Sequence, residues 1–447
     1  MTNESIKIVG GGLAGCELAL QLAHTGAKVT LFEMKPHRRT AAQESDLLSE
    51  LVCSNSFRSA NVGNAIGQLK REMRTAGSFV MKAADAAAVP AGDALAVDRT
   101  IFASTMTEWV HAHPNITVET GVVTQIPSEL TVICTGPLTA PELATEIAQR
   151  AGRDQLHFYD AIAPIIDSDS IDWDVVWRQS RYDKGGADYG NVPLTQDEYY
   201  QFIQDLNQGD QVKAKDFEEN KFFEGCLPIE VMAARGPETL AHGPLKPVGL
   251  TDPNSDESPY AVVQLRMENN EGTAWNLVGF QTRLKYPEQK RIFQKLRGLE
   301  KAEFLRYGSV HRNTYLHAPS LLSDKLHWHD APNLYFAGQI TGVEGYVEST
   351  ACAMLVSWFI RARWQGCSSP SLPPTTAFGA LYRHLRGDGI LSKYVPSNLN
   401  WSLFTPIEKK RREPRRERRL RMGQRAQTDF LAWLESHGHL AWSTSPD

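Results

Sequence analysis

The first thirty-three residues constrain the fold of this chain more than any other segment. Ile6–Val9 has the composition of a short buried strand, residues 10–15 read Gly-Gly-Gly-Leu-Ala-Gly, and Cys16–Thr25 is rich in helix-forming residues. A second apolar stretch, residues 28–32, leads directly to Glu33. The order of strand, glycine turn, helix and strand predicts the opening of a Rossmann-type α/β domain.

Each part of this motif has a physical role in holding a dinucleotide. Gly10 permits the tight turn, Gly12 lets the backbone approach a pyrophosphate, and Gly15 lets the helix pack on the strand. Leu13 and Ala14 lie in the same turn, ahead of a helix whose unpaired N–H groups attract phosphate. Glu33, eighteen positions after Gly15, can accept a hydrogen bond from a ribose hydroxyl and repels a 2′-phosphate. FAD or NAD therefore fits better than NADP, and a glycine turn without a ligand is the less favoured alternative.

Composition indicates an ordinary soluble protein of two or three domains. The chain has 447 residues, 42% of them hydrophobic and 22% charged, and a net charge of −5, which argues against binding nucleic acid over its whole surface. It shows no signal peptide and no apolar run long enough to span a membrane, so we expect a cytoplasmic protein. The cysteines are too widely spaced to suggest a zinc cluster or a disulfide framework: Cys16, Cys53, Cys134, Cys226, Cys352 and Cys367.

The pattern along the chain predicts a Rossmann-type FAD-binding domain with an inserted α+β domain and a helical, basic C-terminal region. The expected helices are 65–90, 99–112 and 348–364, and the expected later strands are 116–119, 130–134, 261–266, 275–280 and 334–338. Glycines at the ends of strands or ahead of the last helix are further candidates for cofactor contact: Gly136, Gly338, Gly342 and Gly345. We expect the FAD-binding domain in residues 1–164 and 301–370, the insertion in 165–300, and a linker with the basic region in 371–447.

Two cysteines have surroundings that suggest chemistry. Cys53 is followed by Ser54, Asn55 and Ser56, whose N–H and hydroxyl groups could stabilise a thiolate. Cys226 lies in a Gly-Cys-Leu-Pro turn within the expected insertion. An inert buried cysteine is the alternative for each of them.

The chain ends in a basic run. Residues 409–421 hold nine Lys or Arg residues against two Glu, a local charge of +7. Such a run is usually a solvated helix face, but its density in an acidic protein suggests contact with the phosphates of RNA. The candidate RNA-binding residues are Lys409, Lys410, Arg411, Arg412, Arg415, Arg416, Arg418 and Arg419.

Seven blocks of sequence together resemble the folate- and FAD-dependent tRNA (uracil-5-)-methyltransferases. The resemblance spans residue 6 to about residue 360, and the basic tail is more charged than the family pattern. The blocks are Gly10 to Glu17, Val52 to Ser56, Phe222 to Cys226, Lys246 to Gly249, Gly279 to Thr282, His311 to Tyr315, and Gly342 to Tyr346.

The resemblance implies a specific reaction. A one-carbon unit passes from 5,10-methylenetetrahydrofolate through reduced FAD to C5 of a uridine in the T-loop of tRNA, with NADPH or NADH as the reductant. It assigns Cys226 as the nucleophile that adds to C6 of uracil and Cys53 as the acid/base partner. It also suggests that His311 stacks on the pterin and that Asn313, Arg283 and Lys285 hold the rest of the folate.

Three other functions are compatible with parts of the pattern. Relatives with the same blocks methylate ribosomal RNA instead of tRNA. A flavin-dependent thiol–disulfide oxidoreductase would use Cys53 and Cys226 as a redox pair, although these lie 173 positions apart. An FAD-containing RNA-binding protein without catalysis would have no need of both cysteines. We expect no metal, and the sequence does not decide the oligomeric state.

Overall fold

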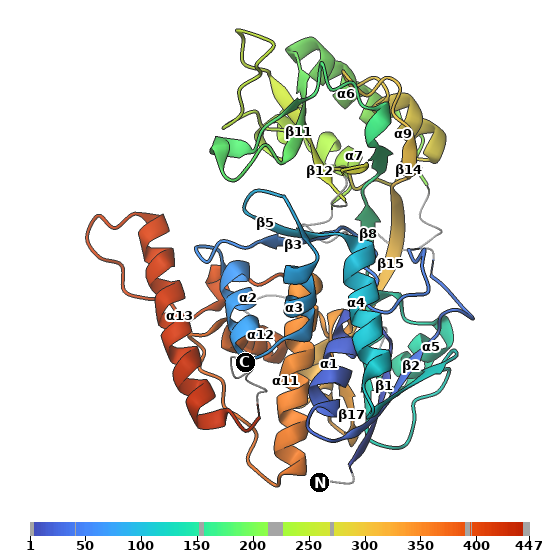
Figure 1. Ribbon diagram of the computed structural model, residues 1–447, viewed down its shortest axis with the longest axis vertical. Helices are drawn as coiled ribbons and strands as arrows, with labels where there is room; N and C mark the ends of the chain where they lie inside the picture. Colours follow the sequence, from blue (N-terminus) through green and yellow to red (C-terminus); the bar gives the residue numbers. More distant parts are fainter. Residues whose placement is uncertain are drawn as a thin grey trace.

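The computed structural model describes most of the chain, in two packed parts connected by a two-stranded ribbon (Figure 1). It describes residues 4–40, 42–151, 156–212, 227–268, 272–388, 394 and 396–440, and for residues 156–162, 309–314 and 415 the backbone only. Cys226 therefore lies outside the described residues. Among the described helices, none combines the length and apolar character needed to cross a membrane.

A six-stranded sheet forms the centre of the first part. Every neighbouring pair is parallel except β16–β17. A nearly parallel sheet of this kind must be covered on both faces by helices, which confirms the predicted Rossmann-type architecture. The spatial order is β16 (His327–Trp328), β17 (Ala331–Phe336), β7 (Thr131–Ile133), β1 (Ser5–Val9), β2 (Lys28–Glu33) and β6 (Ile116–Thr120).

The helices of the first part pack around one helix that is buried on every side. All eleven residues of α1 (Leu13–Ala23) are buried, and α1 packs along α11, the long helix of the returning segment. The helix begins at Leu13, earlier than the predicted start at Cys16, because Gly12 is the extended N-cap. The other helices of this part are α2 (Ala65–Thr75), α3 (Phe79–Ala86), α4 (Arg99–Ala112), α5 (Pro141–Ala151), α10 (Ala318–Leu321), α11 (Tyr346–Trp364) and α12 (Ala377–Arg386).

The prediction of one helix over residues 65–90 is wrong. The chain leaves the first helix at Gly77, which has a φ of 76°, a conformation that favours glycine. Ser78 then caps α3, because its hydroxyl accepts a hydrogen bond from the Met81 N–H. The alanine-rich composition of this segment favours helix throughout, so the break could not be predicted from it.

Two small sheets lie between the two parts. A three-stranded sheet contains β3 (Ser56–Ser59), β5 (Ala94–Val97) and β4 (Ala88–Val89), and the antiparallel ribbon pairs β8 (Leu156–Ile162) with β15 (Ser309–Tyr315). The ribbon carries the chain from one part to the other and back (Figure 1). Since β3 follows Cys53 directly, the cysteine loop also lies at this junction.

The second part has its own antiparallel sheet and its own hydrophobic core, made of residues between Ala163 and Ala302. This is the α+β character predicted for the insertion. The sheet includes β14, beyond residue 300, and the exact division into domains stays a prediction. The strand order is β10 (Trp177–Arg178), β11 (Tyr189–Leu194), β12 (Ala261–Met267), β13 (Ala274–Leu277), β9 (Ile165–Asp167) and β14 (Phe304–Arg306), and the helices are α6 (Gln196–Gln208), α7 (Ile229–Ala234), α8 (Thr239–His242) and α9 (Tyr286–Phe293).

The C-terminal helix α13 (Arg415–His437) lies against the first part, beside α2 and α12 (Figure 1). Its apolar face continues the first core through Met422, Ala426, Phe430 and Trp433. The Trp433 ring lies 4.9 Å from that of Trp358 in α11, and its indole N–H donates to the Ser371 carbonyl at 2.9 Å. The helix is therefore an integral element of the first part.

Truncating Trp433 should detach the helix. Trp433→Ala removes a side chain that is only 4% exposed, so we expect the free energy of unfolding to fall by about 3–5 kcal/mol. Leu431→Ala is the control on the same helix, because Leu431 is 44% exposed and should change stability little. Urea unfolding followed by circular dichroism measures both, and equal effects would contradict the docking.

Candidate functional site

Two glycines of the first turn are required by packing. Gly10 has a φ of 110°, and a Cβ there would lie 2.7 Å from the Cys134 carbonyl oxygen at the end of β7. A Cβ on Gly15 would lie 1.9 Å from the Gly10 carbonyl oxygen. No side chain fits at either position, so the helix can approach the strand only with glycine here.

Gly12 differs, because nothing in the protein requires it to be glycine. Its φ of −78° suits any residue, and a Cβ there would have no heavy atom within 4 Å. The residue is exposed and stands at the N-terminus of α1. Open space at the positive end of a buried helix is the arrangement that a bound phosphate needs.

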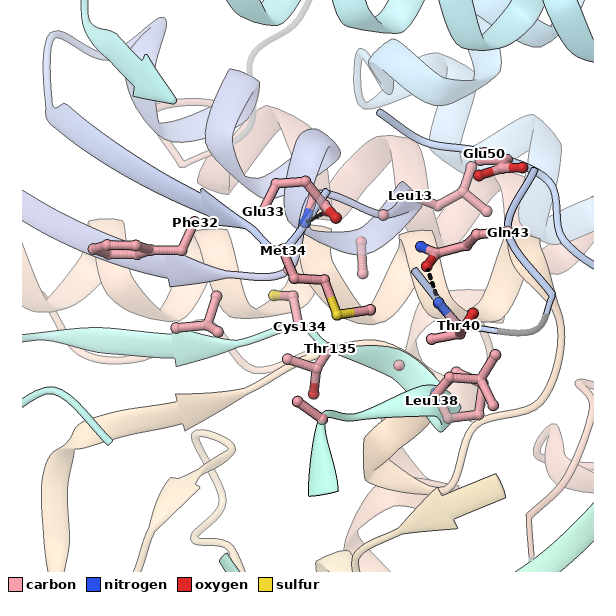
Figure 2. A pocket seen from close by; sticks show the side chains of 18 of the residues that line it. Leu13, Phe32, Glu33, Met34, Thr40, Gln43, Glu50, Cys134, Thr135 and Leu138 are labelled. Atoms are coloured by element: carbon pink, nitrogen blue, oxygen red, sulfur yellow. Dashed lines mark hydrogen bonds between the residues drawn. The ribbon is translucent and has the colours of Figure 1, made fainter. Parts of the chain in front are cut away.

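That space belongs to a cavity of about 1040 Å³, counted out to its open mouth (Figure 2). The walls are the glycine turn from Gly10 to Ala14, the end of β2 from Phe32 to Met34, residues 121–123 after β6, residues 134–138 after β7, and Thr40, Gln43, Glu50, Val52, Gln339, Tyr346 and Ser349 from other segments.

Glu33 lies in the cavity wall and already binds the backbone. One carboxylate oxygen accepts a hydrogen bond from the Gly11 N–H at 2.9 Å, and the other accepts one from the Lys35 N–H at 3.0 Å. A carboxylate has about four lone-pair sites, so each oxygen retains acceptor capacity toward a ribose. Glu33 therefore also fixes the shape of the glycine turn, a role that the sequence did not indicate.

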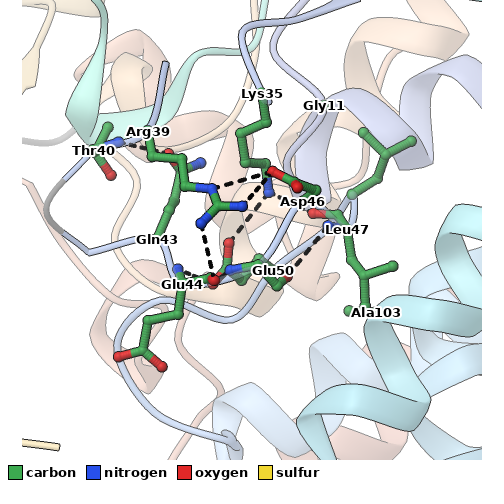
Figure 3. Close-up of polar contacts among 12 residues, drawn as sticks. Gly11, Lys35, Arg39, Thr40, Gln43, Glu44, Asp46, Leu47, Glu50 and Ala103 are labelled. Atoms are coloured by element: carbon green, nitrogen blue, oxygen red, sulfur yellow. Dashed lines mark hydrogen bonds and ion pairs between the residues drawn. The ribbon is translucent and has the colours of Figure 1, made fainter. Parts of the chain in front are cut away.

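The loop after β2 supplies wall residues that sequence reasoning missed. The Thr40 N–H donates to the Gln43 side-chain oxygen at 2.9 Å, and Glu50 accepts from the N–H groups of Glu44 and Ser45 at 2.7 and 3.1 Å (Figure 3). The buried Thr40 hydroxyl has no partner within the part of the chain that the structure describes. A hydroxyl left unpaired in a cavity wall needs a partner, which a polar ligand would provide.

The predicted cofactor glycines fall into two groups. Gly136 lines the cavity together with the first turn, and Gly338 packs against α1, since a Cβ there would lie 2.8 Å from that of Ala14. Gly342 and Gly345 are not among the residues that line the cavity. Their Cβ atoms would meet the Tyr394 hydroxyl at 2.6 Å and a Glu348 carboxylate oxygen at 2.8 Å, so packing accounts for both, and their contact with a cofactor stays a prediction.

The Cys53 loop lies at one end of the cavity. The Tyr346 hydroxyl accepts hydrogen bonds from the N–H groups of Cys53 and Ser54, at 2.7 and 3.1 Å. Tyr346 and Val52 both line the cavity. Burial raises the pKa of the Tyr346 phenol, which keeps it protonated at neutral pH. The first turn of α11 therefore connects the cavity to the cysteine.

Residues of the second part hold the same loop. Arg266 of β12 donates to the side-chain oxygen of Asn55 at 3.1 Å, and the Asn55 amide donates to the Met267 carbonyl at 2.8 Å. Arg306 of β14 donates to the Val52 carbonyl at 3.1 Å. The loop is thus fixed by both parts of the molecule at once.

The predicted folate residues are only partly described. His311 and Asn313 lie in β15, and their side chains are outside the described atoms. Arg283 lies beside Glu230, whose carboxylate accepts its backbone N–H at 2.9 Å, and the Lys285 ammonium lies 3.0 Å from the Asp210 carboxylate. Burial raises the pKa of Glu230. Folate binding by these four residues stays a prediction.

The basic run forms the loop before α13 and its first turns. Among the described side chains only Arg421 of this run forms a salt bridge, with Glu413 at 2.6 Å. None of the other described side chains of the run forms a salt bridge within the described residues, and the Lys410 backbone N–H donates to the Glu413 carboxylate at 3.1 Å. Lys409, Lys410, Arg411, Arg412 and Arg416 are exposed, Arg418 and Arg419 are half-buried, and the Arg415 side chain is not described.

Comparison with known proteins identifies the family. A family model described as glucose inhibited division protein A matches residues 5–368. A Myxococcus xanthus protein named methylenetetrahydrofolate–tRNA-(uracil-5-)-methyltransferase TrmFO is 52% identical over 440 residues, which cover 97% of this chain and 96% of that protein. A Geobacter sulfurreducens protein of the same name is 51% identical, covering 96% of this chain and 99% of its own length.

The chain belongs to this methyltransferase family. The predictions of an enzyme and of this family are confirmed. Two crystal forms of Aquifex aeolicus GidA have the same fold, with TM-scores of 0.69 and 0.68 at 16% and 17% identity. They cover 98% of this chain and 76% and 78% of theirs. At this identity the likeness shows the fold alone, and it confirms the predicted fold class.

Gly12 offers a direct test of the cavity as the family's dinucleotide site. Gly12→Val should leave the fold intact, because its Cβ would have no heavy atom within 4 Å, but the side chain would fill the space at the helix N-terminus. We expect the purified variant to fold and to lose its flavin almost completely. Gly15→Val should instead destabilise the protein. Visible absorbance measures bound flavin, and circular dichroism measures folding. A Gly12→Val protein that is folded and retains all its flavin would contradict the assignment of the cavity as the dinucleotide site.

Proposed function

We propose that this protein transfers a one-carbon unit from 5,10-methylenetetrahydrofolate to C5 of a uridine in tRNA, which gives 5-methyluridine. FAD is the bound cofactor and NADPH or NADH the reductant. The names of the relatives support the substrate class and the folate. The observation that carries the proposal is the contact between Tyr346, in the cavity wall, and the Cys53 loop, because a redox cofactor in the cavity would end beside a thiol.

The residues of the cavity fit a flavin dinucleotide. The turn from Gly10 to Ala14 would hold the pyrophosphate at the start of α1, Glu33 a ribose, and the Thr40 hydroxyl a polar edge. When bound and reduced, the flavin supplies the electrons that convert a methylene group into a methyl group. The chain's own contribution would be to hold the dinucleotide in a cavity whose wall includes Tyr346, the residue that binds the Cys53 loop.

The two cysteines act in sequence in this proposal. The Cys226 thiolate adds to C6 of uracil, which makes C5 nucleophilic. After C5 has received the carbon, the Cys53 thiolate takes the C5 proton. The electrons of the broken C5–H bond then re-form the C5–C6 double bond, and the Cys226 sulfur leaves with the pair of the C6–S bond. Cys53 ends as a thiol and Cys226 as a thiolate, so atoms and charges balance.

The basic run of this chain supports RNA as the substrate. In the proposal its exposed side chains contact RNA phosphates, and the folate is held by His311, Asn313, Arg283 and Lys285. Figure 1 shows the beginning of α13 at the level of β3, which follows the Cys53 loop. The alternative substrate is a uridine in ribosomal RNA.

Cysteine variants test the mechanism. Cys226→Ala should abolish turnover and the covalent adduct with RNA that contains 5-fluorouridine, because C5 is not activated without addition at C6. Cys53→Ala should lose turnover but retain the adduct, because its step comes later. Cys367→Ala is the matched control, since that thiol is exposed and unbridged. Denaturing gels of enzyme, RNA, methylenetetrahydrofolate and NADPH show the adduct; capture by Cys226→Ala but not by Cys53→Ala would reverse the roles.

Substitution of the basic run tests the RNA surface. With Arg415, Arg416, Arg418 and Arg419 changed to Gln, tRNA affinity should fall, and its salt dependence should flatten by roughly one unit of slope for each phosphate that the variant no longer binds. Reduction of the flavin by NADPH should not change. The control replaces four basic residues on other elements with Gln: Lys28, Arg150, Lys301 and Arg363, all exposed. If the two quadruple variants weaken binding equally, the run is an ordinary solvated face.

A further inference from the structure

Arg99, the first residue of α4, is held between the two parts of the molecule beside the Cys53 loop. Its Nε donates to a carboxylate oxygen of Glu268, at the end of β12, at 2.7 Å. One terminal nitrogen donates to the Leu51 carbonyl at 2.6 Å. These two bonds fix the plane of the guanidinium next to the backbone that leads into Cys53.

The third nitrogen of the guanidinium has no assigned role. This terminal NH₂ of Arg99 is buried and has no hydrogen-bond partner within the described part of the chain, and neither has the second oxygen of Glu268. Burial by itself lowers the pKa of Arg99, but Glu268, then Tyr346 and Cys53, outweigh that effect and raise it. The Arg99 guanidinium thus lies close enough to Cys53 for their charges to interact, and a cation with a buried, unused donor is suited to an anion there.

We propose that Arg99 holds the side chain of Cys53 in its thiolate form. This inference deepens the proposed function, because a cysteine can take the C5 proton only as a thiolate. Arg99 is then a positioning residue: it acts on the charge of Cys53 and does not touch the substrate. Glu268 orients it and moderates its charge, so the second part of the molecule contributes to the state of a thiol in the first.

The other charged groups around the Cys53 loop also favour a negative charge on Cys53. Arg266 binds Asn55 and Arg306 binds the Val52 carbonyl, so two further cations face the loop from the second sheet. Glu44 pairs with Arg306 at 3.3 Å. Tyr346 packs from α11 as a neutral phenol. On adjoining segments Lys35 pairs with Glu50 and Arg58 pairs with Glu348, so these charges offset one another. The three guanidinium groups of Arg99, Arg266 and Arg306 then face two carboxylates, Glu268 and Glu44, and a net positive surrounding favours the thiolate.

The pH dependence of alkylation tests the proposal on the flavin-loaded enzyme without RNA. Iodoacetamide reacts with the thiolate, and mass spectrometry of the Cys53 peptide gives the rate at each pH. In Arg99→Gln the midpoint of the profile should rise by about one pH unit or more, so that alkylation below the midpoint slows about tenfold. Arg99→Lys keeps the charge and should lie between Arg99→Gln and the wild type.

Glu268→Gln separates electrostatics from structural damage. It removes the negative charge that offsets Arg99 and keeps an acceptor for its Nε, so the midpoint should move down, opposite to Arg99→Gln. The exposed Cys367 is the internal reference, and its profile should be the same in every variant. Shifts of both variants in the same direction, or an unchanged profile in Arg99→Gln, would overturn the proposal.

The alkylation test remains informative if one variant loses its flavin or if the enzyme does not methylate RNA. If Arg99→Gln does not retain flavin, the opposite shifts of Arg99→Lys and Glu268→Gln relative to the wild type decide the matter by themselves. Because no RNA or folate enters the assay, its outcome is independent of the adduct experiment. The alkylation profile of Cys53 could have a midpoint below the ordinary thiol pKa in an enzyme that does not methylate RNA. That result would refute the proposed function and would still support the interaction between Arg99 and Cys53.

Discussion

The approach of α1 to β1, where the Gly15 backbone meets the Gly10 carbonyl oxygen, is the contact on which the rest of the first part depends. A Cβ on Gly15 would lie 1.9 Å from that oxygen, so a side chain of any size would push the helix away. With the helix in place, all its residues are buried, and α11 can pack along it. That packing brings Tyr346, 331 residues after Gly15 in the chain, to the cavity. The contact between Gly15 and Gly10 thus positions the glycine turn at one end of the cavity and Tyr346 at the other.

The local part of this arrangement could be predicted, because it depends on spacing within thirty residues. The strands and the glycine turn follow from residues 6–33, and the structure contains each of them. The turn lines a cavity, and the binding of a dinucleotide there stays a prediction. Thr40 and Gln43 could not be found in this way, since the hydrogen bonds that shape their loop join residues at no regular spacing. Gly342 and Gly345 suggested a second phosphate turn. Neighbouring side chains also need their small size, and their contact with a cofactor stays a prediction. The prediction of one long alanine-rich helix was wrong because one left-handed glycine, Gly77, follows the first helix.

The cysteine loop lies between the two parts of the molecule, and for this reason its contacts could not be predicted from the sequence. The polar residues after Cys53 suggested thiolate stabilisation by their own hydroxyl and N–H groups. In the structure Asn55 is fully buried and binds Arg266, 211 residues away, while its neighbours bind Tyr346 and Arg306. The loop therefore has its shape only when both parts are assembled around it. Local composition indicated that the cysteine is unusual, but the charges that surround it come from elsewhere in the chain.

Buried glutamates give the scaffold a pH dependence that bears on this site. Glu17 of α1 accepts from the first N–H groups of α3, and Glu72 of α2 accepts from those of α12. Burial raises the pKa of both carboxyls to about 7. Above the unfolded value of about 4.3, the unfolded chain releases these protons while the folded one keeps them, so this contribution to stability falls as pH rises through 7. A cysteine with the ordinary pKa of about 8.5 would be a thiolate mainly where the scaffold is weakest. A cation beside Cys53 moves its ionisation toward lower pH, where these carboxyls are protonated in the folded protein and the scaffold is more stable.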